Sequence, residues 1–224
     1  MKRLLSLTAL VLCISILAAP LANAATPAFN DISGHWAEDT IERFADSGII
    51  SGFPDGSFRP NQRISRAELA AIVTRAFGLS ERVPFSYSDV TPGSWYYEYL
   101  AVAARFIPAW QSLPDEVNKP VFRGNRGISR IYVAEAFALV KMYVEDLEVE
   151  IPPLEERVHQ VRDTFRDRDF HVFDITFACE HYTLRYIWLA HHFGIMVGCS
   201  SGYFRPRWNL SRAEVLTIID RMLE

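Results

Sequence analysis

Apolar residues recur every three or four positions through much of the chain after residue 35, which is the spacing of amphipathic helices. The stretch 36–47 shows this spacing first, and Gly48 stands where a helix C-cap belongs. A second apolar stripe follows from Leu69 to Phe77. The pattern predicts two helices joined by a loop.

Turn and cap residues separate these two helices. Residues 52–56 read Gly-Phe-Pro-Asp-Gly, in which Pro and Asp favour a turn and Gly permits a positive φ. Ser65 and Glu68 have the spacing of a capping box, in which the hydroxyl accepts from the Glu68 N–H and the carboxylate reaches back to the Ser65 N–H. The second helix is therefore predicted to begin beside Arg66.

This helix–loop–helix unit recurs near the C-terminus. A shift of 146 residues aligns 35–78 with 181–224 without a gap, and 15 of the 44 pairs are identical. The capping box returns as Ser211 and Glu214. A match that keeps glycines, turns and the apolar stripe in phase indicates a true internal repeat.

A weaker copy lies between the two strong ones. Trp95 matches Trp36 at a shift of 59 and Arg130 matches Arg66 at a shift of 64, so five extra residues fall between them. This copy lacks the glycine-rich turn and the Ala-Glu that follows the arginine elsewhere. A helix pair cannot bury its apolar stripe alone, so the three copies should pack around a shared axis in an all-α fold. The expected divisions are a signal peptide at 1–24, repeats at 25–80, 81–146 and 163–224, and a linker at 147–162.

The first residues are typical of a secretory signal peptide. Lys2 and Arg3 precede an apolar run over 4–18, and Ala22-Asn23-Ala24 follows, which predicts cleavage after Ala24. The run is about 14 residues long, short of the ~20 that span a bilayer, although a retained anchor is the alternative. No later segment is apolar enough to cross a membrane. We expect an exported, soluble protein.

Composition narrows the function. The chain is 50% hydrophobic and 22% charged, which is typical of a globular protein. Its net charge is −4, and without Lys2 and Arg3 there remain 21 basic and 27 acidic residues, a net −6. This acidity argues against a nucleic-acid partner. Three cysteines without a Cys-x-x-Cys pair predict no structural zinc, and nothing predicts a cofactor.

An arginine opens the second helix of every copy: Arg66, Arg130 and Arg212. A cation there opposes the helix dipole, at a cost of roughly 0.3–1 kcal/mol. The same place offers free N–H groups, so an arginine beside them would hold an anion. The alternative is a structural arginine that pairs with Glu68 or with a neighbouring copy.

The motifs resemble the S-layer homology (SLH) domain. They are His-Trp-Ala at 35–37, the Gly-Ile-Ile-Ser-Gly-Phe-Pro-Asp-Gly-Ser-Phe-Arg-Pro block at 48–60 and Ile-Ser-Arg-Ala-Glu at 64–68. The resemblance implies a pseudo-threefold helical bundle whose inter-repeat grooves bind a pyruvylated secondary cell-wall polysaccharide. The ligand-binding residues that it implies are Trp36, Asp55, Gly56, Arg66, Arg130, Tyr182 and Arg212, together with Trp95 in the degenerate copy. For Trp36 the alternative is a place in the core or in a bundle seam.

The two cysteines beyond the signal peptide both lie in the third copy. An exported chain with two cysteines usually pairs them, and some SLH copies resemble this one in having a cysteine at both places. Cys179 is expected just before a helix that starts near Tyr182, and Cys199 after that helix has ended at Gly194. A disulfide is therefore predicted, with two free thiols as the alternative.

No catalytic residues or metal ligands are predicted. Ser200 lies in a Gly-x-Ser-x-Gly sequence, but a nucleophile elbow needs a strand before it, and the pattern here predicts a helix. The six histidines form no His-Glu-x-x-His motif. The sequence favours a non-catalytic module that attaches to the wall. The alternative is an SLH-fold envelope protein, structural or protein-binding, without polymer binding, which the degenerate second copy favours.

Overall fold

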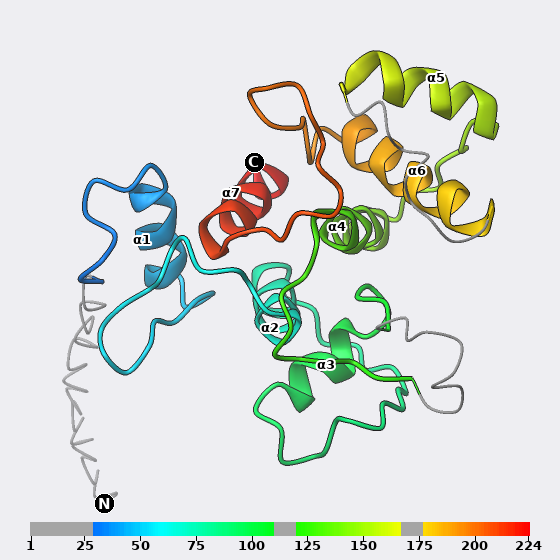
Figure 1. Cartoon of the computed structure of the whole chain (residues 1–224). Helices are drawn as coiled ribbons and strands as arrows, with labels where there is room; N and C mark the ends of the chain where they lie inside the picture. Colours follow the sequence, from blue (N-terminus) through cyan, green and yellow to red (C-terminus); the bar gives the residue numbers. More distant parts are fainter. Residues whose placement is uncertain (1–28, 110–119, 167–176) are drawn as a thin grey trace, which may run out of the picture.

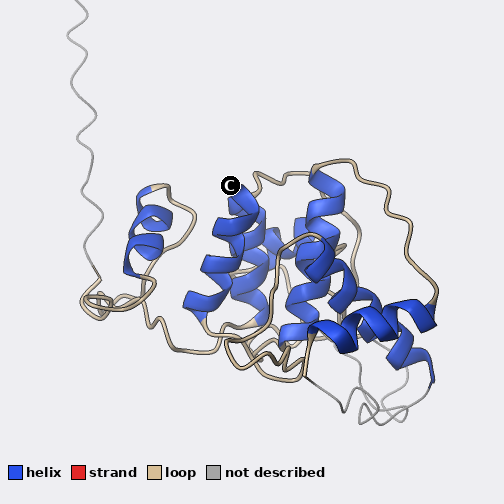
Figure 2. Ribbon diagram, turned by 90° about the horizontal axis from the view of Figure 1, so that it is seen from above, coloured by secondary structure: helices blue, strands red, loops and turns tan. Residues whose placement is uncertain are grey.

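The computed structural model describes residues 29–109, 120–166 and 177–224, with the side chains of 177–182 excepted. These residues form helices and loops without a β-strand, so the all-α prediction is confirmed (Figures 1 and 2). The helices are α1 (Glu38–Asp46), α2 (Arg66–Ala76), α3 (Tyr97–Ala103), α4 (Arg130–Val144), α5 (Leu154–Thr164), α6 (Phe177–His192) and α7 (Arg212–Leu223). None of these helices is both long enough and apolar enough to cross a membrane.

The predicted caps are present. Ser65 and Ser211 each accept a hydrogen bond from the backbone N–H three residues on, and the glutamates at those positions return the second bond of the capping box. Gly48 is the second residue after α1, and its φ of +73° turns the chain out of the helix. Ser129, which opens α4 in the copy without a box glutamate, makes no such bond. The local sequence therefore determines where α2 and α7 begin.

The first helix of each copy packs against the second helix of the copy before it. Thus α3 lies on α2, α6 on α4, and α1 on α7, which closes the cycle between the two ends of the chain (Figure 1). This cyclic packing is the pseudo-threefold arrangement that a shared axis predicts.

Three short segments meet at the centre of this cycle. Ile64 donates its N–H to the carbonyl of Leu210 at 3.0 Å, and Ile128 donates to the carbonyl of Ile64 at 3.2 Å. These three apolar side chains are at most 1% exposed. The segments that precede α2, α4 and α7 are therefore fixed by one another rather than by their own helices.

The third copy differs from the sequence-based expectation at its start. Helix α6 begins at Phe177, not near Tyr182, so Cys179 lies inside the first turn of the helix rather than before it. The physical reason is that no Gly, Pro or capping box interrupts residues 177–192, so the helix extends toward the N-terminus. Helix α5, which packs on α6, begins after Pro152 and Pro153, in the stretch expected to be a linker that ends in a short helix.

Two aspartates that the sequence did not single out clamp the Phe-Arg turns. Asp31 accepts the N–H groups of Phe58 and Arg59 at 2.8 and 2.7 Å. Asp89 does the same for Phe122 and Arg123, at 2.7 and 2.6 Å. The arginine of each pair has a positive φ, 60° and 54°, which an L-residue adopts only when its surroundings require it. The aspartates therefore hold a backbone that would otherwise relax.

We predict that Asp31→Ala destabilises the fold by about 1–3 kcal/mol, because two hydrogen bonds to a carboxylate are lost around a strained residue. Urea unfolding of the two proteins measures this difference. Asp31→Asn keeps one acceptor oxygen and should fall between them. An alanine variant as stable as the wild type would show that the clamp does not matter.

A bidentate ion pair joins the first and last helices. Arg43 on α1 donates to the two carboxylate oxygens of Asp220 on α7, at 2.9 and 2.7 Å. The hydrogen bonds from Arg43 are the main reason why the pKa of Asp220 is below its ordinary value. The pair closes the helix cycle by charge as well as by packing.

The Arg43–Asp220 ion pair predicts that the contact between α1 and α7 weakens at acid pH. The pKa of Asp220 is lower in the folded state than in the unfolded state. The stability that the ionised carboxylate contributes is therefore fully present above the unfolded-state pKa of about 3.9, and it is lost as the pH falls through the folded-state pKa. Asp220→Asn should lower Tm by a few degrees at neutral pH, and the difference should shrink below about pH 4. The control is Glu42→Gln, an exposed carboxylate on α1. A difference in Tm that does not vary with pH would argue against the ion pair.

Candidate functional site

The helix-start arginines reach across to neighbouring copies. The Arg66 guanidinium carbon lies 4.8 Å from the centre of the Phe122 ring, that of Arg130 lies 5.4 Å from Phe204, and that of Arg212 lies 4.4 Å from Phe58. All three phenylalanine rings are 0% exposed. Each arginine therefore lies over the buried ring of the next copy around the cycle, which is a cation–π contact.

Arg66 is the most enclosed of the three arginines. It is 1% exposed, and it donates from Nε to the carbonyl of Phe122 at 2.6 Å and from Nη2 to the carbonyl of Pro108. Burial lowers the pKa of its guanidinium. These contacts fit the structural alternative for this arginine.

Arg212 is 4% exposed and pairs with a carboxylate. Its Nε donates to the carbonyl of Phe58 at 2.9 Å, and its Nη1 donates to Oε1 of Glu68, the glutamate of the first capping box. Burial lowers the pKa of Arg212, and the Glu68 carboxylate opposes that shift. An anionic ligand at Arg212 would therefore have to displace Glu68 or share the guanidinium with it.

The helix-start N–H groups are not free, contrary to the expectation from sequence. Arg66 and Ala67 donate theirs to the carbonyls of Arg126 and Gly124, at 3.0 and 2.9 Å. The N–H groups that open α4 and α7 are bonded in the same way to the carbonyls of the next copy. The loops around the axis occupy these N–H groups, so an anion at the helix starts would have to be bound by the arginine side chains rather than by the backbone.

Two grooves lie at equivalent places between the copies. Groove A encloses about 250 Å³ and groove B about 260 Å³. Each groove is lined by the second helix of one copy, by the tryptophan that precedes the first helix of the next copy, and by the arginine that begins the second helix of the previous copy. Groove A is lined by Ile50, Ser51, Gly52, Phe53, Glu68, Ala71, Ile72, Arg75, Trp95 and Arg212. Groove B is lined by Trp36, Arg130, Gly198, Cys199, Arg205, Trp208, Asn209, Leu210, Glu214, Thr217, Ile218 and Arg221.

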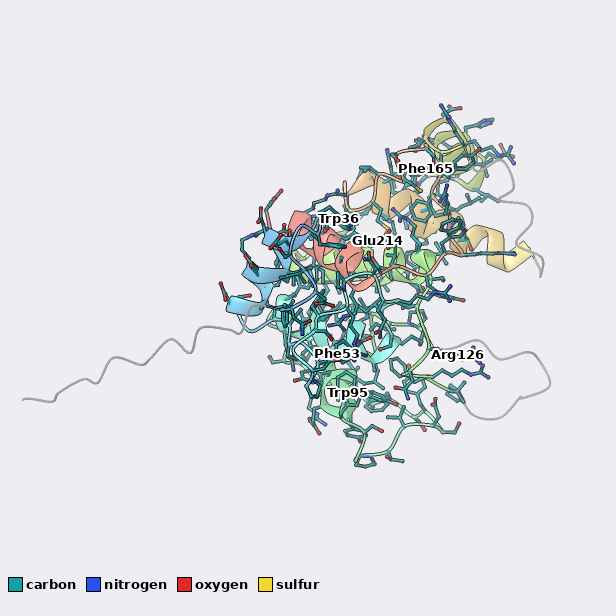
Figure 3. The ribbon with its side chains drawn as sticks, turned by 60° about the vertical axis from the view of Figure 1, so that its left-hand side comes forward. Trp36, Phe53, Trp95, Arg126, Phe165 and Glu214 are labelled. Atoms are coloured by element: carbon teal, nitrogen blue, oxygen red, sulfur yellow. The ribbon has the colours of Figure 1, made fainter. Side chains whose placement is uncertain are left out.

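The tryptophans of these grooves are surface residues. Trp36 is 64% exposed and Trp95 is 58% exposed, so neither belongs to the core. Figure 3 shows Trp36 beside Glu214 and Trp95 beside Phe53, at the edges of grooves B and A respectively. Each indole therefore offers a flat apolar face to solvent beside charged groups.

The cations of the two grooves are held differently. In groove A, Arg75 lies 4.7 Å over the Tyr99 ring and donates to its hydroxyl and to the carbonyl of Ile49. Its counterpart in groove B is Arg221, an exposed residue in the last turn of α7. Among the described residues no hydrogen bond or ion pair engages the Arg221 side chain. Both arginines are exposed, but the donors of Arg221 are the less occupied by other residues of the described chain.

Asp55 and Gly56 shape a turn outside both grooves. The Asp55 carboxylate accepts the Ser57 hydroxyl at 2.5 Å and pairs with Arg59 at 2.8 Å, and these bonds lower its pKa. Gly56 has φ +78° and donates to the carbonyl of Phe53 at 2.9 Å. Neither residue lines groove A, so their observed contacts are those of turn residues.

Several residues singled out from sequence lie outside the described part. These are residues 1–24 of the expected signal peptide and the side chains of Tyr182 and Cys179. Cys199 is described: it lines groove B as a free thiol, and its Sγ donates to the carbonyl of Tyr203 at 2.9 Å. The pairing of the two cysteines stays a prediction. Mass spectrometry of the exported protein, alkylated without reductant, should detect no free thiol; two alkylated cysteines would refute the disulfide.

The described residues contain no group of three or more His, Cys, Asp or Glu side chains placed to hold a metal ion. Ser200 is exposed in a turn that follows α6, and no strand leads into it within the described chain. It therefore lacks the strand–turn–helix setting of a nucleophile elbow.

The sequence is similar to a known domain and to several known proteins. The model of the S-layer homology domain matches residues 28–70. Cell surface glycoprotein 1 of Acetivibrio thermocellus is 40% identical over 73 residues, or 32% of this chain and 3% of that protein. The cellulosome-anchoring protein of the same organism is 40% identical over 76 residues, or 32% of this chain and 16% of that protein. Amylopullulanase of Thermoanaerobacterium thermosulfurigenes is 28% identical over 197 residues, or 88% of this chain and 9% of that protein.

The chain therefore spans less than a fifth of the length of each of these relatives. Residues 28–70 thus match the S-layer homology domain, and the similarity of the chain to surface-layer and cell-surface proteins indicates a location at the cell-envelope surface.

Proposed function

We propose that this S-layer homology protein is a non-catalytic attachment module that holds an anionic, pyruvylated cell-wall polysaccharide in its inter-copy grooves. The observation that carries the proposal is the pair of equivalent grooves, each with a tryptophan more than half exposed beside arginine. The relatives named for the cell surface and for anchoring support the same role.

The chemistry of the grooves supports a sugar acid rather than a highly charged ligand. The protein has a net charge of −4, so its overall field repels a polyanion. Attraction has to come from local groups, and groove B offers Arg130, Arg205 and Arg221 against one glutamate, Glu214. An indole supplies the apolar face for the ring, and a guanidinium supplies the hydrogen bonds for a carboxylate.

The alternative function is a structural or protein-binding role without polymer binding. The observation that favours it is the burial of Arg66 and Arg212, whose donors are bonded to carbonyls of neighbouring copies and, for Arg212, to Glu68. Under that alternative, the grooves would be surface hollows without a glycan ligand.

Retention on purified wall sacculi separates the two functions. The full chain is mixed with sacculi, with sacculi whose pyruvyl groups have been removed by mild acid, and with sacculi stripped of the polysaccharide. The proposal expects sedimentation with the first alone. Equal retention on all three would support the alternative, because a protein or peptidoglycan contact would then hold the chain.

A further inference from the structure

Groove B carries an aromatic–cation pair that the repeat pattern does not contain. Trp208 is 62% exposed, and the guanidinium carbon of Arg205 lies 4.2 Å from the centre of its ring. The equivalent position in the first copy is Gln62, which does not line groove A. A large exposed indole at one position of one copy is not explained by packing of the fold.

The position of Arg205 follows from two other differences between the copies. In the first copy, Arg59 lies 3.9 Å over the Phe53 ring and pairs with Asp55 at 2.8 Å. In the third copy, Cys199 stands in place of that ring and Ser201 in place of that carboxylate.

The ring and the carboxylate that hold Arg59 are thus replaced in the third copy, where Arg205 donates to the Ser201 hydroxyl at 3.4 Å and stacks on Trp208. Groove B is lined by Cys199, Arg205 and Trp208, whereas groove A has Phe53 at the place of Cys199 and is lined by neither Arg59 nor Gln62.

Both grooves follow the second helix of their copy, but groove B continues past the start of that helix to a tryptophan. Glu214 and Arg221 in groove B, like Glu68 and Arg75 in groove A, lie seven residues apart, which corresponds to about 10 Å along the helix. Trp208 lies beyond the N-terminal end of α7, and Arg221 lies in its last turn. Both line groove B, whereas no residue between 54 and 67 lines groove A, so the lining of groove B extends beyond the stretch that the two grooves share.

We propose that groove B binds two consecutive sugar residues of an anionic glycan, and that the second sugar stacks on the Trp208 indole beside Arg205. The first sugar lies between Trp36 and α7, where Arg221 meets its carboxylate. Groove A, with Gln62 at the equivalent position, binds one sugar. This inference rests on the proposed function and adds to it a second subsite that one groove alone possesses.

Two synthetic probes test the inference: a pyruvylated monosaccharide glycoside and a disaccharide with the same pyruvylated sugar at its terminus. The readout is the ratio of the two affinities, measured by calorimetry on the full chain with the Trp95→Ala substitution, which weakens groove A. The disaccharide should bind about tenfold more tightly, because stacking removes apolar surface from water. Trp208→Ala should bring the ratio close to one, and Trp208→Tyr should restore most of it.

Gln62→Ala is the matched control, and it should leave the ratio at the value of its parent. The side chain of Trp208 is mostly exposed and its carbonyl, which accepts the Arg130 N–H, is kept, so the thermal midpoint should not move. A ratio near one in the parent, or a ratio that survives Trp208→Ala, would overturn the second subsite. Binding of neither probe would instead refute the proposed function, and the inference with it.

Discussion

Replacing Arg66 by alanine should lower the free energy of unfolding by about 3–5 kcal/mol. The side chain is 1% exposed, and it donates to the carbonyls of Phe122 and Pro108 while it covers the Phe122 ring. Its removal leaves two carbonyls without donors and a cavity between the first and second copies. Urea unfolding monitored by circular dichroism measures the loss.

Arg63→Ala is the control for Arg66→Ala. Arg63 is an exposed arginine three residues earlier, and its loss should change stability by no more than about 0.5 kcal/mol. Arg66→Lys should recover part of the stability, since an ammonium reaches a carbonyl but cannot cover the ring as a guanidinium does. If Arg66→Ala melts like the wild type and fails to bind sacculi, the arginine serves the ligand rather than the bundle.

The sequence predicts the local features of this fold but not the long-range contacts of Arg66. The capping boxes, the positive φ of Gly48 and Gly56, and the helix spacing are local features, so the sequence predicts them correctly. The placement of Arg66 is not local, because its partners lie 42 and 56 residues away in another copy. A helix-start arginine looks solvent-exposed until the neighbouring copy is in place.

Asp31 and Trp208 are not predicted from the sequence either, because their contacts also depend on distant parts of the chain. Asp31 has no motif around it, and its clamp on Arg59 exists only once the chain folds back over 28 residues. Trp208 could have been noticed as an indole where the first copy has Gln62, but the sequence does not show that it faces the groove. The start of α6 differs from the prediction because the repeat begins at His181, and nothing in the repeat marks the four residues before it.

Removing the groove tryptophans should abolish wall binding without unfolding the protein. Trp36→Ala and Trp95→Ala should each weaken retention on sacculi about tenfold, because each loses one stacking platform. The two grooves lie on one molecule and can engage one polymer network together, so the double variant should fall to background. Both indoles are more than half exposed, and Tm should stay within a few degrees of the wild type.

Val144→Ala provides the matched control for this loss. Val144 is 49% exposed at the end of α4 and lines neither groove, so its removal takes away exposed apolar surface without touching a groove. Its retention should equal that of the wild type. If the double tryptophan variant also sediments with sacculi as the wild type does, the grooves do not hold the wall, and the structural role that the buried Arg66 and Arg212 favour is the one to pursue.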